Sequence, residues 1–411
     1  MVKHVLRDNW QQELKITVIV AHDAYLKGAH NICRLLGDQA NIQVSWFTTS
    51  KLLASHDLSY IDIENAVREK KLNDDLVQAD MVIAGLGGRG LNKLIYGIRK
   101  FVSKSYDNIT FPKIIGYFPG VLHLRIFESL ATRLLCDQVL LNCERDYFLY
   151  RKLALATIGK DNGLMFGAPW ISPPPTTSIP QDIDLLFVEQ SVVPETLRDR
   201  TSLIKCLIAL ARQHPSWRIV VALRARKGNA SSHDLKYCLE EISQNLLAGE
   251  GGVEFVIDDI DHLIARSHRI ATISSSVAYT SLAWDKETWF IRDLGVNKNW
   301  GNDLFKRSGY MVWLHQIGDL VFSKSTWCSR FVKLPCPNII NQLKYAKNNH
   351  YVDSIPRFNV TNMRLLWVVF IFCLKNFKNP LVEMRDLLVT IRNINGRIYR
   401  LKEKKENINK V

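Results

Sequence analysis

Three consecutive serines, Ser274, Ser275 and Ser276, stand between a short apolar run and a helical pattern. Their hydroxyl groups and free backbone N–H groups would gather where a helix begins after a strand. Helix N-termini bind phosphate and carboxylate groups, because the N–H groups and the helix dipole both favour negative charge. Ordinary capping by serine is the alternative, but capping requires one hydroxyl rather than three. We therefore predict that these serines bind an anionic group.

A basic loop follows the predicted strand 218–223. It begins with Arg224 and contains His233. Cationic groups beyond the carboxyl end of a strand in an open α/β sheet lie beside the ligand site, although a solvated basic loop is the alternative. His214 stands before the same strand in a His-Pro pair. We therefore predict that His214 forms a structural turn at the opposite end of the strand.

The first part of the chain offers a carboxylate and a glycine-rich turn. Asp23 follows the predicted strand 15–20, where it could deprotonate a substrate hydroxyl or simply cap a helix. The motif GLGGRG at 85–90 follows the strand 81–84 and matches the dinucleotide pattern GxGxxG. The next strand, 113–117, is not followed by an acidic residue for a ribose, which weakens the dinucleotide interpretation. The alternative is a glycine turn whose backbone N–H groups suit an anionic acceptor, or simply a tight turn. The candidate substrate-binding residues of this part are Gly87, Gly88, Gly120, Arg125 and Glu144.

The elements that must position these residues alternate along the chain. Apolar strand patterns in the first half lie at 15–20, 42–47, 81–84, 113–117 and 138–141. Those in the second half lie at 185–189, 218–223, 253–257, 270–273 and 288–291. Helical patterns separate many of them, including 25–36, 197–213 and 234–248. This alternation predicts an α/β protein with parallel sheets that are covered on both faces.

A proline-rich segment divides the two groups of strands. Residues 171–182 include four prolines together with serine and threonine, a composition that cannot continue a helix or a central strand. We therefore predict a first Rossmann-like domain over 1–170, a linker over 171–182 and a second Rossmann-like domain over 183–345. The remaining residues, 346–411, are predicted to form a helical basic segment.

Composition restricts the partners and the compartment. The chain has 54 Lys and Arg against 40 Asp and Glu, a formal charge of +14 that favours anionic partners. Its eight cysteines form no CxxC pair and are predicted to be reduced core residues. The polar N-terminus lacks a signal peptide, and the apolar run 365–374 is too short to span a bilayer, which predicts a cytoplasmic protein. The basic C-terminal segment either packs on the first domain or lies peripherally on the inner face of the plasma membrane.

The order of several motifs resembles that of a group of bacterial GT-B glycosyltransferases. This group is similar to the sialyltransferases and polysialyltransferases of capsule and lipopolysaccharide synthesis. The resemblance extends over about residues 16–310 and depends on the order of the motifs. They are Phe118-Pro119-Gly120-Val121, Arg133 with Cys136-Asp137, Asn142-Cys143-Glu144, Leu223-Arg224-Ala225 with Gly228 and Ser232-His233, Ser274-Ser275-Ser276, Asp293-Leu294-Gly295-Val296 and Phe305-Lys306-Arg307-Ser308-Gly309.

The resemblance implies a GT-B fold, with two Rossmann-like domains facing a cleft, and an inverting, metal-independent transfer. The donor would be a nucleotide-sugar, such as CMP-activated sialic acid or a related acidic sugar, with no further cofactor. The acceptor would be a cell-surface glycan or a lipid-linked glycan. The serines at 274–276 and Arg224 would bind the donor, His233 would stabilise the leaving CMP and Asp23 would be the acceptor base. Gly87, Gly88, Gly120, Arg125 and Glu144 would bind the acceptor.

Three alternatives remain open from the sequence. A non-catalytic basic protein could bind a membrane or nucleic acid through its charge, but the basic residues are spread along the chain and no nucleic-acid motif is present. We therefore expect no nucleic-acid partner. A nucleotide-dependent oxidoreductase could use the GLGGRG loop. A metal-dependent transferase could use Asp258, Asp259 and Asp261, because carboxylates are ligands of divalent cations.

Overall fold

The chain divides into two compact units, Met1–Trp170 with Pro335–Val411, and Ile171–Leu334. The computed structural model describes residues 13–21, 23–48, 79–102, 112–123, 126–224, 236–247, 252–338, 343 and 389, and every structural observation concerns these residues. The chain leaves the second unit after Leu334, earlier than the predicted boundary at 345. Cys336 donates its backbone N–H to the carbonyl of Phe166 in the first unit over 2.7 Å, and Leu343 is buried in the same unit.

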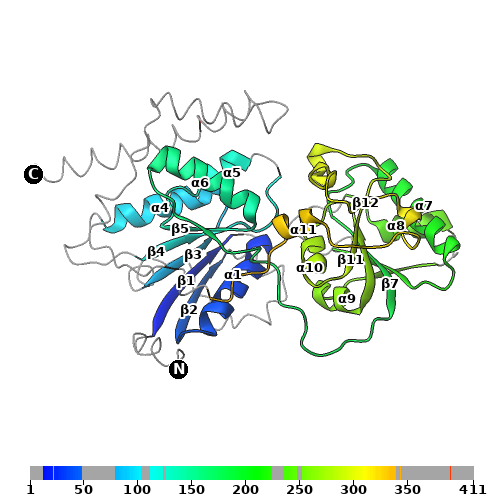
Figure 1. Ribbon diagram of the computed structural model, residues 1–411, viewed down its shortest axis with the longest axis horizontal. Coiled ribbons are helices and arrows are strands. Elements are labelled where there is room, and N and C mark those ends of the chain that lie inside the picture. Colours follow the sequence, from blue (N-terminus) through cyan, green and yellow to red (C-terminus); the bar gives the residue numbers. More distant parts are fainter. Residues whose placement is uncertain are drawn as a thin grey trace, which may run out of the picture. The chain divides into compact units, whose positions relative to one another are not determined.

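The first domain is built on a six-stranded parallel sheet in the order β2-β1-β3-β4-β5-β6 (Figure 1). Its strands are β1 (Leu14–Val20), β2 (Ile42–Thr48), β3 (Met81–Gly85), β4 (Lys113–Gly116), β5 (Gln138–Leu141) and β6 (Gly163–Met165). Its helices are α1 (Asp23–Gly37), α4 (Gly88–Val102), α5 (Ile126–Ala131) and α6 (Glu144–Ile158).

Both faces of this sheet are buried, which explains why its strands are continuous apolar runs rather than alternating ones. Consecutive residues of β3 point to opposite faces. Val82 packs in a core with α4, α5 and α6, whereas Ile83 packs in a second core with α1. Figure 1 shows the same division, with α4, α5 and α6 together on one side of the sheet.

The second domain is built on another six-stranded parallel sheet, in the order β12-β11-β10-β7-β8-β9. Its strands are β7 (Ile183–Val188), β8 (Ile219–Ala222), β9 (Val253–Val256), β10 (Ser267–Thr272), β11 (Glu287–Ile291) and β12 (Met311–Val312). Its α-helices are α7 (Leu197–Gln213), α8 (Leu239–Leu247), α9 (Ile260–Arg266), α10 (Val277–Ala283) and α11 (Thr326–Phe331). The 3-10 helices are η2 (Lys298–Trp300), η3 (Asn302–Phe305) and η4 (Leu314–Gln316).

The strand orders identify both units as doubly wound Rossmann-like domains. Numbered within the second domain, the order is 6-5-4-1-2-3, which is the order of the Rossmann fold read from the other edge. The first domain has the order 2-1-3-4-5-6. The predicted α/β class with two Rossmann-like domains is therefore confirmed. The strand order reverses between β1 and β3 in the first sheet and between β7 and β10 in the second.

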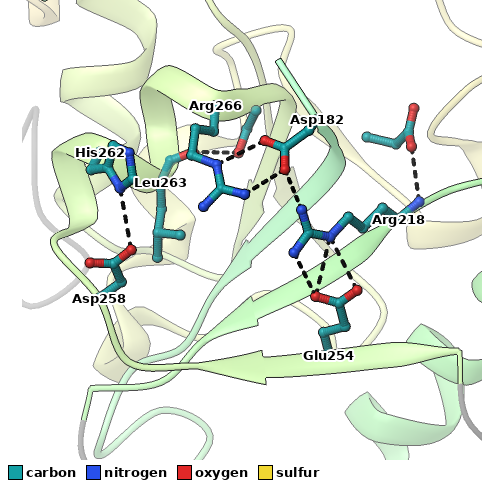
Figure 2. Close-up of polar contacts among 9 residues, drawn as sticks. Asp182, Arg218, Glu254, Asp258, His262, Leu263 and Arg266 are labelled. Atoms are coloured by element: carbon teal, nitrogen blue, oxygen red, sulfur yellow. Dashed lines mark hydrogen bonds and ion pairs between the residues drawn. The ribbon is translucent and has the colours of Figure 1, made fainter. Parts of the chain in front are cut away.

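The proline-rich segment is fastened to the second domain at both of its ends. Near its start, the Trp284 indole N–H donates to the carbonyl of Ser172 over 2.9 Å. At its end, Asp182 forms ion pairs with Arg266 and Arg218, and Arg218 also pairs with Glu254 at 2.9 Å (Figure 2). These ion pairs lie at the amino end of the second sheet, because Asp182 precedes β7 and Arg218 precedes β8. The segment is therefore an anchored part of the second domain.

The part of the chain that the structure describes contains no helix that is long and apolar enough to cross a bilayer. The predicted helical basic segment over 346–411 lies outside the described residues, apart from the helical residue Val389.

The ion pairs of Asp182 predict a pH-dependent stability. The hydrogen bond from Arg266 lowers the pKa of Asp182 to about 2, below the ordinary value of 3.8. Because the folded pKa is the lower one, the contribution is complete above the unfolded pKa and is lost as the pH falls through the folded one. Asp182→Asn should therefore lower the free energy of unfolding in urea at pH 6, and the difference from the parent should shrink by pH 3.

Asp319→Asn is the matched control, because Asp319 is exposed and forms no ion pair with the described residues. This change should have no measurable effect at either pH. A constant effect of Asp182→Asn between pH 6 and pH 3 would contradict the linkage.

Candidate functional site

Each sheet gathers its predicted site residues at one edge. All strands of a parallel sheet point the same way, so the residues that follow them meet at the carboxyl edge, and ligands bind there where the strand order reverses. In the first domain this point lies beyond β1 and β3, whose ends are joined by a hydrogen bond from the Ala21 N–H to the Gly85 carbonyl over 3.2 Å. In the second domain it lies beyond β7 and β10.

The first sheet brings its described candidates to this edge. Asp23 follows β1 as the first residue of α1, while Gly87 and Gly88 follow β3 at the start of α4. Gly120 follows β4, and Glu144 begins α6 after β5. Arg125 lies outside the described residues. The backbones of Asp23 and Gly87 thus stand on either side of the point where the strand order reverses.

Close packing accounts for two glycines of the GLGGRG motif. A Cβ atom on Gly85 would collide with the hydroxyl of Tyr117, and one on Gly88 would lie only 2.6 Å from Cγ2 of Thr132. A Cβ on Gly87 would meet no atom within 4 Å. The motif therefore does not require a bound dinucleotide to explain it, and Gly87 is the position that faces open space.

A buried arginine holds several strand ends of the first sheet together. Arg133 lies after α5 and is 3% exposed. Its guanidinium donates hydrogen bonds to the Tyr117 carbonyl over 3.2 Å and to the Tyr25 hydroxyl over 3.0 Å. A longer contact of 3.4 Å reaches the carbonyl of Leu86. Arg133 belongs to the motifs of the resemblance, but the sequence did not assign it a role.

In the second domain, a glutamine that the sequence did not single out bridges the point of reversal. Gln190 follows β7, and its Oε1 accepts the backbone N–H of Ser274, which follows β10, over 3.0 Å. The Gln190 amide N–H also donates to Oγ of Ser274 over 3.2 Å. The same hydroxyl donates to the carbonyl of Trp300 in η2 over 2.5 Å. Ser274 therefore joins three loops.

The other two serines have different environments. Oγ of Ser275 accepts the backbone N–H of Val277 over 3.3 Å, so this hydroxyl caps the start of α10. Ser276 is the N-cap residue of α10, but its side chain makes no capping hydrogen bond. Its half-buried hydroxyl has no hydrogen-bond partner among the described residues. Of the three predicted hydroxyls, the one on Ser276 is thus available to a ligand.

A buried ion pair fixes the loop that carries Gln190. Nη1 of Arg200 in α7 lies 2.7 Å from Oε1 of Glu189, and both side chains are 1% exposed. Nη2 of Arg200 donates to the carbonyls of Gln190 and Ser191 over 2.9 and 2.7 Å, and Nε donates to that of Pro194 over 2.9 Å. One guanidinium thereby holds four residues of the segment that follows β7.

The electrostatics of Glu189 connect this loop with the neighbouring strand. Burial raises the pKa of the Glu189 carboxyl, and the Arg200 guanidinium together with the backbone N–H groups of Arg224 and Leu239 opposes the rise. Arg224 follows β8, where its side chain is exposed. The Glu189 carboxyl at the end of β7 thus lies near the backbone of Arg224, the predicted donor-binding residue that follows β8.

The structure describes one of the two histidines that the sequence analysis discussed, His214. His233 lies outside the described residues. His214 ends α7, and its ring stacks on Trp217 with centroids 4.1 Å apart, near the amino end of β8. This position agrees with a structural turn and is remote along the strand from the carboxyl edge.

The carboxylates of the metal alternative are engaged in local hydrogen bonds. Asp259 caps α9 by accepting the His262 N–H over 2.9 Å, and Asp258 accepts the N–H of Asp259 over 2.7 Å. Asp258 also lies 3.2 Å from Nδ1 of His262 (Figure 2). The described residues contain no group of three or more His, Cys, Asp or Glu that could hold a metal ion.

Comparison with known families decides the family of this chain. Residues 16–330 match the model of DUF6716, whose description is "Putative glycosyltransferase". The chain belongs to this family. The match covers both Rossmann-like domains of this DUF6716 protein up to α11, and leaves the basic C-terminal segment outside. No curated protein matches the sequence.

Several solved structures are similar to this DUF6716 protein at low identity. The UDP-GlcNAc 2-epimerase of Methanocaldococcus jannaschii gives a TM-score of 0.48 at 10% identity, covering 73% of this chain and 88% of that chain. The UDP-GlcNAc 2-epimerase of Neisseria meningitidis, bound to UDP-GlcNAc, gives 0.47 at 11%, covering 80% and 99%. The Escherichia coli heptosyltransferase WaaC gives 0.36 at 11%, covering 68% and 89%. The family assignment rests on the family model alone.

The Arg200–Glu189 pair predicts a strong coupling between the two side chains. Arg200→Met should lower the free energy of unfolding by about 3–5 kcal/mol, because it leaves a buried carboxylate without its partner. Glu189→Gln removes the charge that Arg200 needs. The double variant should be less destabilised than the sum of the single changes by about 1–3 kcal/mol, measured by urea unfolding. Additive effects would contradict a mutually dependent pair.

Proposed function

We propose that this protein is a glycosyltransferase that binds its nucleotide-sugar donor at the carboxyl edge of the second sheet. The observation that carries the proposal is the hydrogen bond between Gln190 and Ser274, called the junction below. It lies where the strand order of the second sheet reverses, between β7 and β10. Open α/β sheets bind nucleotides at such points. The Ser276 hydroxyl has no hydrogen-bond partner among the described residues, and the exposed Arg224 follows β8, the strand beside β7. Both side chains are suited to an anionic phosphate.

The reaction is a single displacement at the anomeric carbon of the donor sugar. The acceptor hydroxyl oxygen forms the new bond to this carbon, and the bond from the carbon to the phosphate oxygen breaks. The electron pair leaves with the nucleotide, whose developing charge is stabilised by Ser276, Arg224 and His233. Asp23 takes the proton of the acceptor hydroxyl as general base. Such a displacement inverts the configuration and needs no metal ion.

The donor and acceptor follow from the resemblance to sialyltransferases. We propose a CMP-activated acidic sugar as donor and a cell-surface or lipid-linked glycan of capsule or lipopolysaccharide synthesis as acceptor. The basic segment over 346–411 would bring the enzyme to an anionic membrane surface. Thermal unfolding of the full chain with CMP-, UDP- and GDP-sugars tests the donor, because a ligand that binds the folded state raises the melting temperature.

Adjacent serines provide a matched pair of variants for the donor site. Ser276→Ala should weaken donor binding by about tenfold or more, since a lost charge-assisted hydrogen bond costs about 1.5–3 kcal/mol, and should leave the melting temperature unchanged. Ser275→Ala should cost about 1 kcal/mol of stability through the lost cap and should leave the affinity for donor nearly unchanged. Calorimetric titration and unfolding measure the two effects. Equal donor affinities in both variants would remove Ser276 from the site.

The histidines provide a second matched pair. His233→Ala should lower kcat by about two to three orders of magnitude if its side chain stabilises the leaving nucleotide. His214→Ala should cost about 1 kcal/mol of stability, because it removes a ring stacked on Trp217, and should leave kcat unchanged. Loss of activity in folded His214→Ala, with activity retained in His233→Ala, would reverse the two assignments.

A further inference from the structure

Among the described residues of the first domain, the buried positive charge of Arg133 has no counter-ion. Each nitrogen of the Arg133 guanidinium donates to a neutral oxygen. The acceptors are the carbonyls of Tyr117, Ser129 and Leu86, the hydroxyl of Tyr25 and Oγ1 of Thr132. The guanidinium carbon also lies 4.1 Å from the centre of the Phe118 ring. Among the described residues, no carboxylate forms an ion pair with Arg133.

This is unusual because buried charges in proteins are normally paired. The second domain provides the comparison within the same chain. Arg200 is equally buried and also fixes a loop at the point where the strand order reverses, but Glu189 lies 2.7 Å away and neutralises it. Arginine stays protonated in proteins, so Arg133 cannot escape the cost by losing its proton.

The start of α4 adds to this positive potential. Nη2 of Arg133 reaches the carbonyl of Leu86, directly before Gly87, and Thr132, another partner of Arg133, packs against Gly88. The helix has 15 residues and no acidic residue in its first turn, so its positive end is not compensated locally. The open space at Gly87 lies at this helix start.

We propose that this edge of the first domain binds an anionic group, a phosphate or carboxylate, which supplies the counter-charge that Arg133 lacks. Given the proposed transferase function, this group belongs to the acceptor, which is therefore acidic. Arg133 itself has no hydrogen-bond donor left for the ligand. It acts as a positioning residue whose charge favours an anion seated on the N–H groups of α4 beside Gly87.

Gly87 offers a sharp test, because its side of the backbone is open and it precedes α4. Gly87→Asp places a carboxylate at the helix start, where it occupies the position of the ligand charge. Gly87→Asn is the matched control, since it has the same size and capping ability without the charge. Both are made in full-length Ser276→Ala protein, so that the second domain contributes little to anion binding. Glucose 1-phosphate, glucuronate and glucose are then titrated by calorimetry.

We expect the Gly87→Asn protein to bind glucose 1-phosphate or glucuronate and not glucose, and Gly87→Asp to weaken that binding by about tenfold or more. The two acids distinguish a phosphate-bearing from a carboxylate-bearing acceptor. Without ligand, Gly87→Asp should melt at a higher temperature than Gly87→Asn. Equal anion binding by both variants, or binding of glucose as tight as that of the acids, would overturn the proposal.

A further measurement separates this proposal from the proposed function. With Ser276 retained, both Gly87 variants should bind the nucleotide-sugar donor as the parent does, because the donor site lies on the second domain. Failure of donor binding in the parent would contradict the transferase assignment, while the anion titrations would still test the first domain. If both Gly87 variants fail to fold, titration of the Ser276→Ala protein with the three probes decides the outcome.

Discussion

The second domain depends on one buried ion pair, Arg200 with Glu189. Removing two charges from water is costly, and the cost is offset when the geometry is close and further hydrogen bonds are made. Arg200 meets this condition by donating to the carboxylate and to three carbonyls of the loop after β7. The loop is thereby fixed, and Gln190 can hold Ser274 at the junction of β7 and β10.

Both domains use arginine for the same mechanical task. A planar guanidinium has five N–H donors in a rigid arrangement, so one side chain can hold several carbonyls from different loops. Arg133 does this for the ends of β3 and β4, and Arg200 does it for the loop after β7. A lysine at either position could supply only three donors from a single nitrogen atom. The domains differ in charge, because Glu189 neutralises Arg200, whereas Arg133 has no carboxylate partner in the described part of the chain.

The sequence predicted the elements whose patterns are long or strongly apolar. The helix over 197–213 has the bounds of α7, and the central strands β3, β5 and β7 lie where apolar runs were expected. Short or polar elements were missed. The pattern for β10 began at 270, whereas the strand begins at Ser267, because His268 and Arg269 resemble a loop. The strands β6 and β12 have three and two residues, too few to establish a period.

Candidate site residues could be predicted from the sequence where a side chain suited to ligand binding directly follows a predicted strand. The serines at 274–276 were predicted in this way, and the structure places them after β10. Glu189, Gln190 and Arg200 were not, because their roles come from contacts across the fold. Gln190 bonds with a residue 84 positions away. The structure also separates the three serines, which the sequence treats alike, since the backbone turn directs one hydroxyl to Gln190 and Trp300 and another to the start of α10.

The neutralisation of Arg200 has a consequence for how a donor phosphate would be held. A guanidinium whose charge is balanced by a carboxylate at 2.7 Å adds little attraction for a second anion. In the proposed reaction, the negative charge of the leaving nucleotide would be met by groups closer to solvent, such as Ser276 and Arg224. In the second domain the buried arginine fixes the loop after β7 and is neutralised by Glu189. In the first domain Arg133 fixes the ends of β3 and β4 and has no carboxylate partner among the described residues.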